Sequence, residues 1–194
     1  MELDIVKYPD PVLKRVSKPI AEIDDDVREK ARLMIDLMYR DKGVGLAAPQ
    51  VGWSARLFVM NPTGKPEDVR IFVNPTISGK SKTVERSNEG CLSIPEVNGK
   101  IERALKIRIE GYDLDGQAVS LDLEGFPARI CQHEFDHLEG ILIIDRMSPA
   151  ERSVADPVLR ALRDEYAHAQ ECDDPDHDHG HDHGPAGKPR KPKF

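Results

Sequence analysis

The order of apolar and polar positions predicts one long helix near the start of the chain. Apolar residues at positions 23, 27, 31, 34 and 38 fall on one face of a helix that runs from about residue 25 to residue 41. Asp26 with Glu29 resembles a capping box at its start, and Gly43 supplies a stop. A shorter helical pattern lies near residues 11–17.

Short strands are predicted in the middle of the chain. Strand patterns cover residues 56–60, 69–75 and 82–86. Residues 105–112 and 118–123 alternate between apolar and polar, and Asp115-Gly116 between them is a strong hairpin signal. Residues 43–52 hold too many glycines and small side chains for a regular element. We interpret them as a loop that lets a ligand approach the backbone closely.

Helical patterns return towards the C-terminus. Gly125 with Pro127 predicts the start of a helix, and Gly140 predicts its end. A last helix is expected over residues 149–170, although Pro157 must start, kink or divide it. Strands followed by helices, without βαβ alternation, indicate an α+β fold. We expect short, mostly antiparallel sheets around a central buried helix carrying the sequence HEFDH, with a C-terminal helix.

Composition divides the chain into two parts. Of its 194 residues, 39% are hydrophobic and 32% charged, which is typical of a globular protein; we expect one domain, residues 1–170. Residues 171–194 are rich in Asp and His and then basic, and almost free of apolar side chains. Such a segment cannot bury enough surface to offset its ordering entropy, so we expect a disordered tail.

Charge and cysteine usage limit the partners and the compartment. A net charge of −7 argues against direct nucleic-acid binding, which needs a basic face. Cys91, Cys131 and Cys172 lack the spacing of a disulfide framework, which favours a reducing compartment. No apolar run approaches the ~18–20 residues that span a membrane, and the first residues lack a leader pattern. We therefore expect a cytoplasmic protein without a membrane partner.

The most informative motif is H-E-x-x-H, formed by His133, Glu134 and His137. Residues four apart are neighbours on one helical face, so both imidazoles can reach one ion. Glu134 leans over the same side, within reach of a water on that ion. Ile130 shares this stripe of the helix, whereas Cys131 lies on a second, apolar stripe and is interpreted as packing.

A catalytic metal site needs a third protein ligand and one open position. The downstream acids Asp145, Glu151 and Asp164 are candidates, but nothing around them supports that role. Cys91 lies in the segment NEGCLSIP, residues 88–95, between a glycine and a proline that ends it. A thiolate with two imidazoles makes a good tetrahedral site for zinc or ferrous iron. Taken alone, the cysteine also fits a small buried hydrophobic side chain.

Three segments together resemble the motifs of the peptide deformylase family. They are residues 43–50 (GVGLAAPQ), 89–95 (EGCLSIP) and 132–140 (QHEFDHLEG), in matching order and spacing, and the similarity extends over about residues 1–165. The resemblance implies a metal-dependent hydrolase that removes the formyl group from the N-terminal formyl-methionine of newly made proteins, a step of N-terminal processing in protein biosynthesis. Its expected partners are formyl-methionyl nascent peptides, with the ribosome as a further candidate.

The same resemblance assigns roles within the site. Cys91, His133 and His137 hold one divalent metal, with ferrous iron as the expected physiological ion and zinc, nickel or cobalt as alternatives. Metal-bound hydroxide then attacks the formyl carbon while Glu134 acts as general base and acid. The family's donors to the developing oxyanion correspond here to the Gln50 side chain and the backbone N–H of Leu92.

Substrate contacts are expected from two segments. Main-chain groups of Val44, Gly45 and Leu46 would pair with the peptide like an added strand. Phe126 and Ile130 would form the walls of the methionine pocket, although ordinary core packing explains them equally well. In place of an arginine present in some family members after EGCLSIP, this chain has EVNG at residues 96–99, which changes the rim of the site.

Some interpretations stay open from the sequence. Glu89 pairs with Arg103 and braces the Cys91 strand, or it is a solvated surface residue. A zinc endopeptidase shares the H-E-x-x-H chemistry but requires a third ligand other than cysteine. A metal-handling protein is suggested by the histidines alternating through residues 177–183, yet the rest of the chain has no such bias. We interpret that run as an appendage, either solubilising or capturing metal.

Overall fold

A computed structural model describes residues 2–172, so all but the first two residues of the predicted tail lie outside the described part. The elements, in chain order, are η1 (Pro11–Lys14), α1 (Asp25–Arg40), β1 (Gly45–Ala47), η2 (Ala48–Val51), β2 (Leu57–Met60), η3 (Pro66–Asp68), β3 (Arg70–Ser78), β4 (Val84–Cys91), β5 (Ile94–Ala104), β6 (Lys106–Tyr112), β7 (Ala118–Glu124), α2 (Phe126–Leu138), α3 (Ile143–Arg146) and α4 (Pro149–Cys172).

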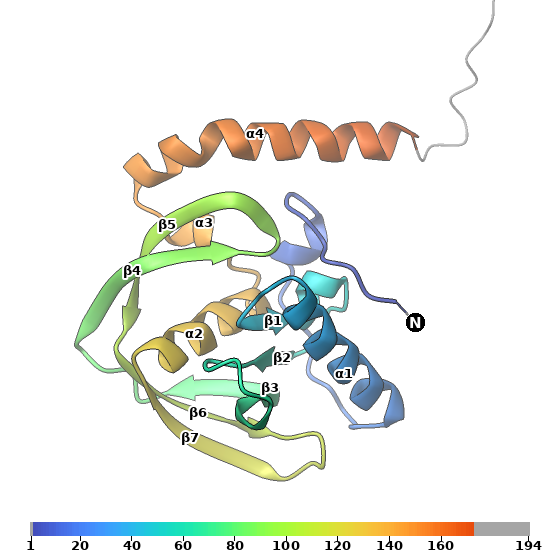
Figure 1. The fold of residues 1–194 in the computed structure, drawn as a ribbon, viewed down its shortest axis with the longest axis vertical. Coiled ribbons are helices and arrows are strands. Elements are labelled where there is room, and N and C mark those ends of the chain that lie inside the picture. The colour runs from blue at the N-terminus through green and yellow to red at the C-terminus, as the bar shows by residue number, and fades with distance from the viewer. Residues whose placement is uncertain (1, 173–194) are drawn as a thin grey trace, which may run out of the picture.

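The strands form two antiparallel sheets, with helix α2 at the centre of the molecule (Figure 1). The five-stranded sheet has the order β1-β2-β3-β6-β7, and β4 pairs only with β5. Helix α2 packs on β1, β2 and β7 of the first sheet and on β5 of the second. Helix α1 covers β1 and β2, and α4 packs on β5. The predicted α+β architecture around a central helix is confirmed.

Apolar packing explains the position of α2. It begins after Gly125, which has a φ of 66°, and Pro127 occupies its first turn, as the sequence predicted. Its buried Ala128, Cys131 and Leu138 pack in one cluster with side chains of the five-stranded sheet, among them Phe58, Phe72, Ile107 and Ile109. The buried central helix is therefore the element around which the two sheets assemble.

Two details near the N-terminus differ from the prediction. Helix α1 is capped by Asp24, whose carboxylate accepts a hydrogen bond from the Val27 backbone N–H at 2.9 Å, so the proposed Asp26–Glu29 box is wrong. The segment interpreted as an irregular loop contains strand β1 and the 3₁₀ helix η2. Its small side chains concealed a strand that is buried along its whole length.

The largest missed element is β5, which pairs with β4 over most of its length. Its buried positions alternate regularly from Val97, but they include Gly99 and Arg103, which carry no apolar signal. Helix α4 runs through Pro157 instead of starting or dividing there. This proline lies on an exposed turn, where water can satisfy the carbonyl that loses its partner.

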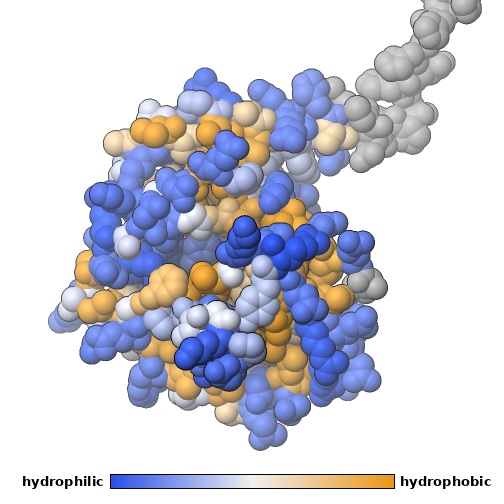
Figure 2. Space-filling model, viewed as in Figure 1, coloured by the Kyte–Doolittle hydropathy of each residue, from blue (hydrophilic) through white to orange (hydrophobic). Residues whose placement is uncertain are grey.

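Figure 2 shows hydrophobic side chains gathered near the middle of one face, with hydrophilic ones around them. None of the helices in residues 2–172 has the length and apolar character needed to cross a membrane.

Candidate active site

The H-E-x-x-H helix and the end of strand β4 meet at one point. His133 and His137 project from α2 with ring centroids 5.1 Å apart. Cys91, the last residue of β4, places its Sγ atom 3.3 Å from Nε2 of His137. The candidate ligand atoms of the three side chains all lie within 4.8 Å of one another. The structure thus brings together the three residues proposed for the metal, in a group that can hold one divalent ion.

The chemistry of this donor set suits a divalent metal. A thiolate and two imidazoles are common ligands of zinc and iron, and three protein donors leave one position open. Burial lowers the pKa of His137 well below its usual value, which keeps the ring neutral and able to offer a lone pair. Within residues 2–172, the buried Nδ1 atom of His137 has no hydrogen-bond partner.

The three acids considered as alternative ligands lie elsewhere. Asp145 accepts a hydrogen bond from the Leu142 N–H at 2.8 Å, and Glu151 accepts one from the Lys100 N–H at 2.9 Å. Asp164 is exposed on α4. Among the described residues, none of these acids joins the cluster, which removes the third ligand that an endopeptidase of this motif requires.

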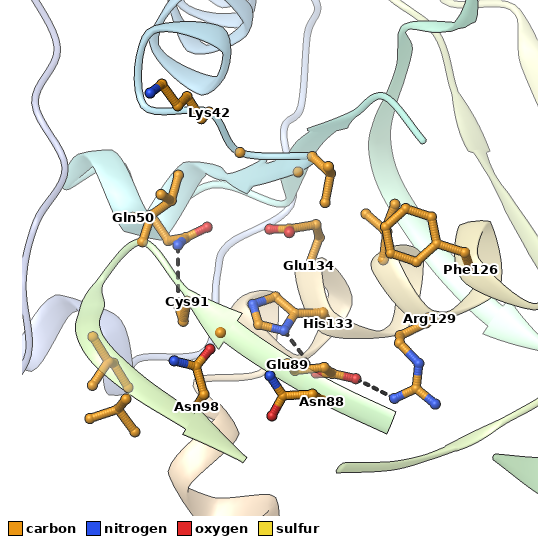
Figure 3. A pocket seen from close by; sticks show the side chains of 18 of the residues that line it. Lys42, Gln50, Asn88, Glu89, Cys91, Asn98, Phe126, Arg129, His133 and Glu134 are labelled. Carbon is orange, nitrogen blue, oxygen red and sulfur yellow. Dashed lines mark hydrogen bonds and ion pairs between the residues drawn. The ribbon is translucent and has the colours of Figure 1, made fainter. Parts of the chain in front are cut away.

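Glu134 is buried beside the cluster and points into the same pocket as His133 (Figure 3). Its Oε2 atom has no hydrogen-bond partner in the described part of the chain. Gly45 on β1 lies against it: a Cβ atom there would come within 2.7 Å of Cδ of Glu134. Glycine is therefore required at position 45 for this carboxylate to keep its place. Burial raises the pKa of Glu134 to about 7.

Gln50 and Leu92 are both neighbours of Cys91, the first in space and the second in the chain. The Oε1 atom of Gln50 accepts a hydrogen bond from the Ala47 N–H at 2.9 Å, which directs Nε2 the other way. Nε2 is 3.6 Å from Cys91 Sγ and donates to Ser93 Oγ at 3.2 Å. Leu92 sits in the turn between β4 and β5, directly after Cys91. The Gln50 amide nitrogen is thus the donor that the structure places beside Cys91 Sγ.

A pocket of about 400 Å³ opens in front of these groups. Four of the five residues predicted to contact substrate line it: Val44, Gly45, Phe126 and Ile130. The side chain of Leu46 does not, because alternation along β1 turns it into the core, where it is fully buried. Its backbone faces Val59 of β2. Since β1 is an edge strand, its opposite side remains available for pairing.

A buried ionic network supports His133 from behind. Glu89 accepts two hydrogen bonds from Arg103, at 3.0 and 2.9 Å, and one from Arg129 at 2.7 Å. Nδ1 of His133 lies 3.0 Å from the same carboxylate, so this nitrogen carries the proton and Nε2 is left for a ligand. Burial acts to raise the pKa of Glu89, but hydrogen bonds from His133 and Arg103 lower it to about 2.

Asp136 extends the network on the far side of Arg103. It pairs with Arg103 and accepts a hydrogen bond from Arg146 at 2.9 Å. Of these partners, the sequence indicated only the Glu89–Arg103 pair, as one of two alternatives, and the structure confirms that pair. Arg129 and Asp136 were missed, although charged residues on a helix with so many buried positions were a usable signal.

Comparison with known proteins gives a consistent result. The family described as polypeptide deformylase matches residues 2–153. A peptide deformylase of Thermotoga neapolitana is 46% identical over 145 residues, covering 75% of this chain and 87% of that protein. Peptide deformylase 1B of Arabidopsis thaliana, named chloroplastic/mitochondrial, is 41% identical over 165 residues, covering 84% of this chain and 58% of that protein.

Solved structures show the same likeness. The peptide deformylase of Plasmodium falciparum superposes with a TM-score of 0.82 at 43% identity, covering 85% of this chain and 98% of that one. The fold and the site together define a metal-dependent hydrolase. More narrowly, the chain belongs to the peptide deformylase family. The predicted family and enzyme class are thereby confirmed.

Proposed function

We propose that this site removes the formyl group from N-terminal formyl-methionine of newly made peptides, using Glu134 as proton shuttle. The observation that carries the proposal is the convergence of Cys91, His133 and His137 within 4.8 Å beside a buried carboxylate. These three side chains would hold one divalent metal. Such an ion acidifies water and polarises a carbonyl group.

Glu134 moves the proton. With a pKa raised by burial to about 7, its carboxylate is suited to accepting a proton from the attacking water near neutral pH. As the C–N bond of the formamide breaks, the same group returns that proton to the leaving amine nitrogen. Within the described residues its Oε2 atom has no hydrogen-bond partner, so the carboxylate is not committed to another group.

Gln50 and Leu92 stabilise the negative charge that develops on the formyl oxygen. The Gln50 amide is fixed by the Ala47 N–H, so its Nε2 donor is oriented before substrate arrives. Removal of one such donor typically lowers kcat by ~10²–10³. The backbone N–H of Leu92, the residue directly after Cys91, is the second donor.

Substrate binds across the edge of β1. The peptide pairs with the main chain of residues 44–46, which reads backbone without reading sequence. Phe126 and Ile130 provide apolar walls for the methionine side chain, together with the exposed Val44. The rim is completed by Lys42 and by Glu96 and Asn98 of β5.

Formate release from a formyl-methionyl peptide tests the function directly. The wild-type chain should release formate, and Glu134→Gln should lose activity by about 10²–10⁴-fold while keeping its metal. Glu29→Gln, on the exposed face of α1, is the matched control and should retain full activity. Loss of metal in Glu134→Gln, in step with activity, would move Glu134 among the ligands and contradict its role.

Ferrous iron is the proposed physiological ion. Cys91 next to a redox-active metal should oxidise readily in air, so iron-loaded protein should lose activity faster than zinc- or nickel-loaded protein. Elemental analysis of protein purified without air provides the second measurement. Equal lifetimes for all three metals would argue against iron.

We propose that the protein acts in the cytoplasm, on formylated peptides as they emerge from the ribosome. Cosedimentation with ribosomes tests docking apart from catalysis.

We also propose that the catalytic unit ends at about residue 170. Removing residues 171–194 should therefore leave kcat/KM on a short formyl peptide within about twofold. A larger loss in fully metal-loaded enzyme would show that the catalytic unit extends further.

A further inference from the structure

The first residues of the chain cross both segments that carry the proposed oxyanion donors. The Val6 N–H donates to the Gln50 carbonyl at 2.8 Å. The Lys7 ammonium donates to the Leu92 carbonyl at 2.7 Å, and the Tyr8 N–H donates to the Ser93 carbonyl at 2.8 Å. Residues 6–8 therefore hold the Gln50 segment and the turn after Cys91 to one another. We call residues 6–8 the N-terminal strap.

The N-terminal strap is itself anchored on both sides. Ile5 packs against the core cluster that contains α1, whereas Val6 packs against the cluster of β5 and α3. Within the strap, the Tyr8 hydroxyl accepts a hydrogen bond from Arg163 of α4 at 2.9 Å. Beyond the strap, Leu13 is fully buried. A segment fixed in this way can transmit its position to what it contacts.

We propose that the N-terminal strap positions the two oxyanion donors, and that Lys7 is the positioning residue for the Leu92 peptide. The proposal rests on the function proposed above. It assigns a catalytic consequence to a lysine that is not among the residues lining the pocket.

The turn after Cys91 needs such a restraint. The β4–β5 register shifts at Gly90 and Cys91, and Cys91 pairs directly with Ile94, which leaves Leu92 and Ser93 outside the ladder. Between these paired ends, Leu92 and Ser93 each keep two soft dihedrals. Lys7 and Tyr8 hold the two carbonyls of the turn, and the Cys91–Ile94 pairing holds its ends. The Leu92 carbonyl shares its peptide unit with the Ser93 N–H, and the Leu92 N–H lies in the preceding unit, between Cys91 and Leu92. Lys7 therefore restrains the Leu92 N–H from its C-terminal side, through the backbone of Leu92.

Lys7→Met removes the ammonium and keeps most of the apolar stem. Because a misplaced donor weakens transition-state binding more than substrate binding, kcat should fall about five- to tenfold while KM changes less than twofold. Lys7→Arg retains a donor and should recover most of the loss. Lys18→Met is the matched control: this lysine is also exposed, and among residues 2–172 its ammonium makes no hydrogen bond or ion pair.

Backbone amide exchange gives a second readout that does not depend on turnover. In zinc-loaded protein, exchange of the Leu92 and Ser93 amides should accelerate in Lys7→Met and not in Lys18→Met. Unchanged exchange and unchanged kcat in an active enzyme would overturn the strap proposal and leave the proposed function standing. A rise in KM alone would show instead that Lys7 contacts substrate. A wild-type chain that releases no formate would refute the function, while the exchange result would still decide whether Lys7 orders the turn.

Discussion

The two sides of helix α2 are held by opposite kinds of interaction. Towards the five-stranded sheet, Ala128, Cys131 and Leu138 pack against apolar side chains such as Phe72 and Ile109. Towards the β4–β5 sheet, the same helix meets a network of buried charges made by Glu89, Arg103, Arg129 and Asp136, which the exposed Arg146 joins at its edge. The apolar contacts on one side do not depend strongly on direction, whereas the hydrogen-bonded ion pairs on the other side do.

The difference separates stability from precision. Apolar burial favours compactness with little demand on angle, and it tolerates substitutions that conserve volume. Buried ion pairs gain little net free energy after desolvation, but their hydrogen bonds fix geometry. Here they fix the ring of His133, and they hold the strand that ends at Cys91. His133 and Cys91 are two of the three proposed metal ligands. The apolar side fixes where the helix lies, and the charged side fixes the orientation of the side chains that it presents to the metal.

Breaking the charged side should have the largest effect. Arg103→Met leaves Glu89 and Asp136 buried with fewer partners, and removal of one member of such a pair costs about 3–5 kcal/mol. The free energy of unfolding from urea denaturation measures this loss. A loss of unfolding free energy below about 1 kcal/mol, the range of an exposed ion pair, would contradict this prediction.

A smaller change to the same network should act on the metal more than on the fold. Glu89→Gln keeps the size of the side chain but weakens the hydrogen bond that orients His133. Loss of such a supporting partner typically lowers metal affinity by about 10–100-fold. Competition against a chelator measures the affinity. Glu102→Gln, at an exposed position of β5, is the control and should bind metal normally.

The mildest change belongs to the apolar side. Ile109→Val removes one methyl group from the cluster under α2 and should cost about 1 kcal/mol of unfolding free energy. Metal affinity and kcat should remain within twofold of the wild type, because no hydrogen bond is altered. If this variant lost metal affinity as strongly as Glu89→Gln, the proposed division between the two sides would be wrong.

The sequence revealed the parts of the site whose geometry is local. His133, Glu134 and His137 lie on one helix, so their spacing alone predicts how they converge. The contribution of Cys91 depended on family resemblance, since nothing local links it to His133 and His137, more than forty residues further on. The N-terminal strap was not foreseen for the same reason: Val6, Lys7 and Tyr8 donate to carbonyls of segments far along the chain, and neither these donors nor their acceptors form a local pattern.

Strands were missed where buried positions hold glycine or a charged residue instead of an apolar side chain. Strand β5 buries Gly99 and Arg103 at positions where a strand pattern expects apolar residues. The arginine is buried only because two carboxylates from distant segments neutralise it, and no reading of β5 alone can supply them. Strand β1 was concealed by glycine, whose purpose at position 45 appears only when Glu134 stands beside it.

The Glu134 side chain occupies the space that a side chain at position 45 would need, although the two residues lie far apart in the sequence. A Cβ atom at position 45 would overlap Oε1 of Glu134 and lie 2.7 Å from Cδ and 2.8 Å from Cγ of the same side chain. Glu134→Asp would not relieve this overlap, because aspartate keeps the Cγ atom and bears its oxygens on it. An alanine at 45 therefore excludes either acid from the present position of the carboxylate. Any redesign of this pocket has to keep glycine at 45 as long as an acid is needed at 134.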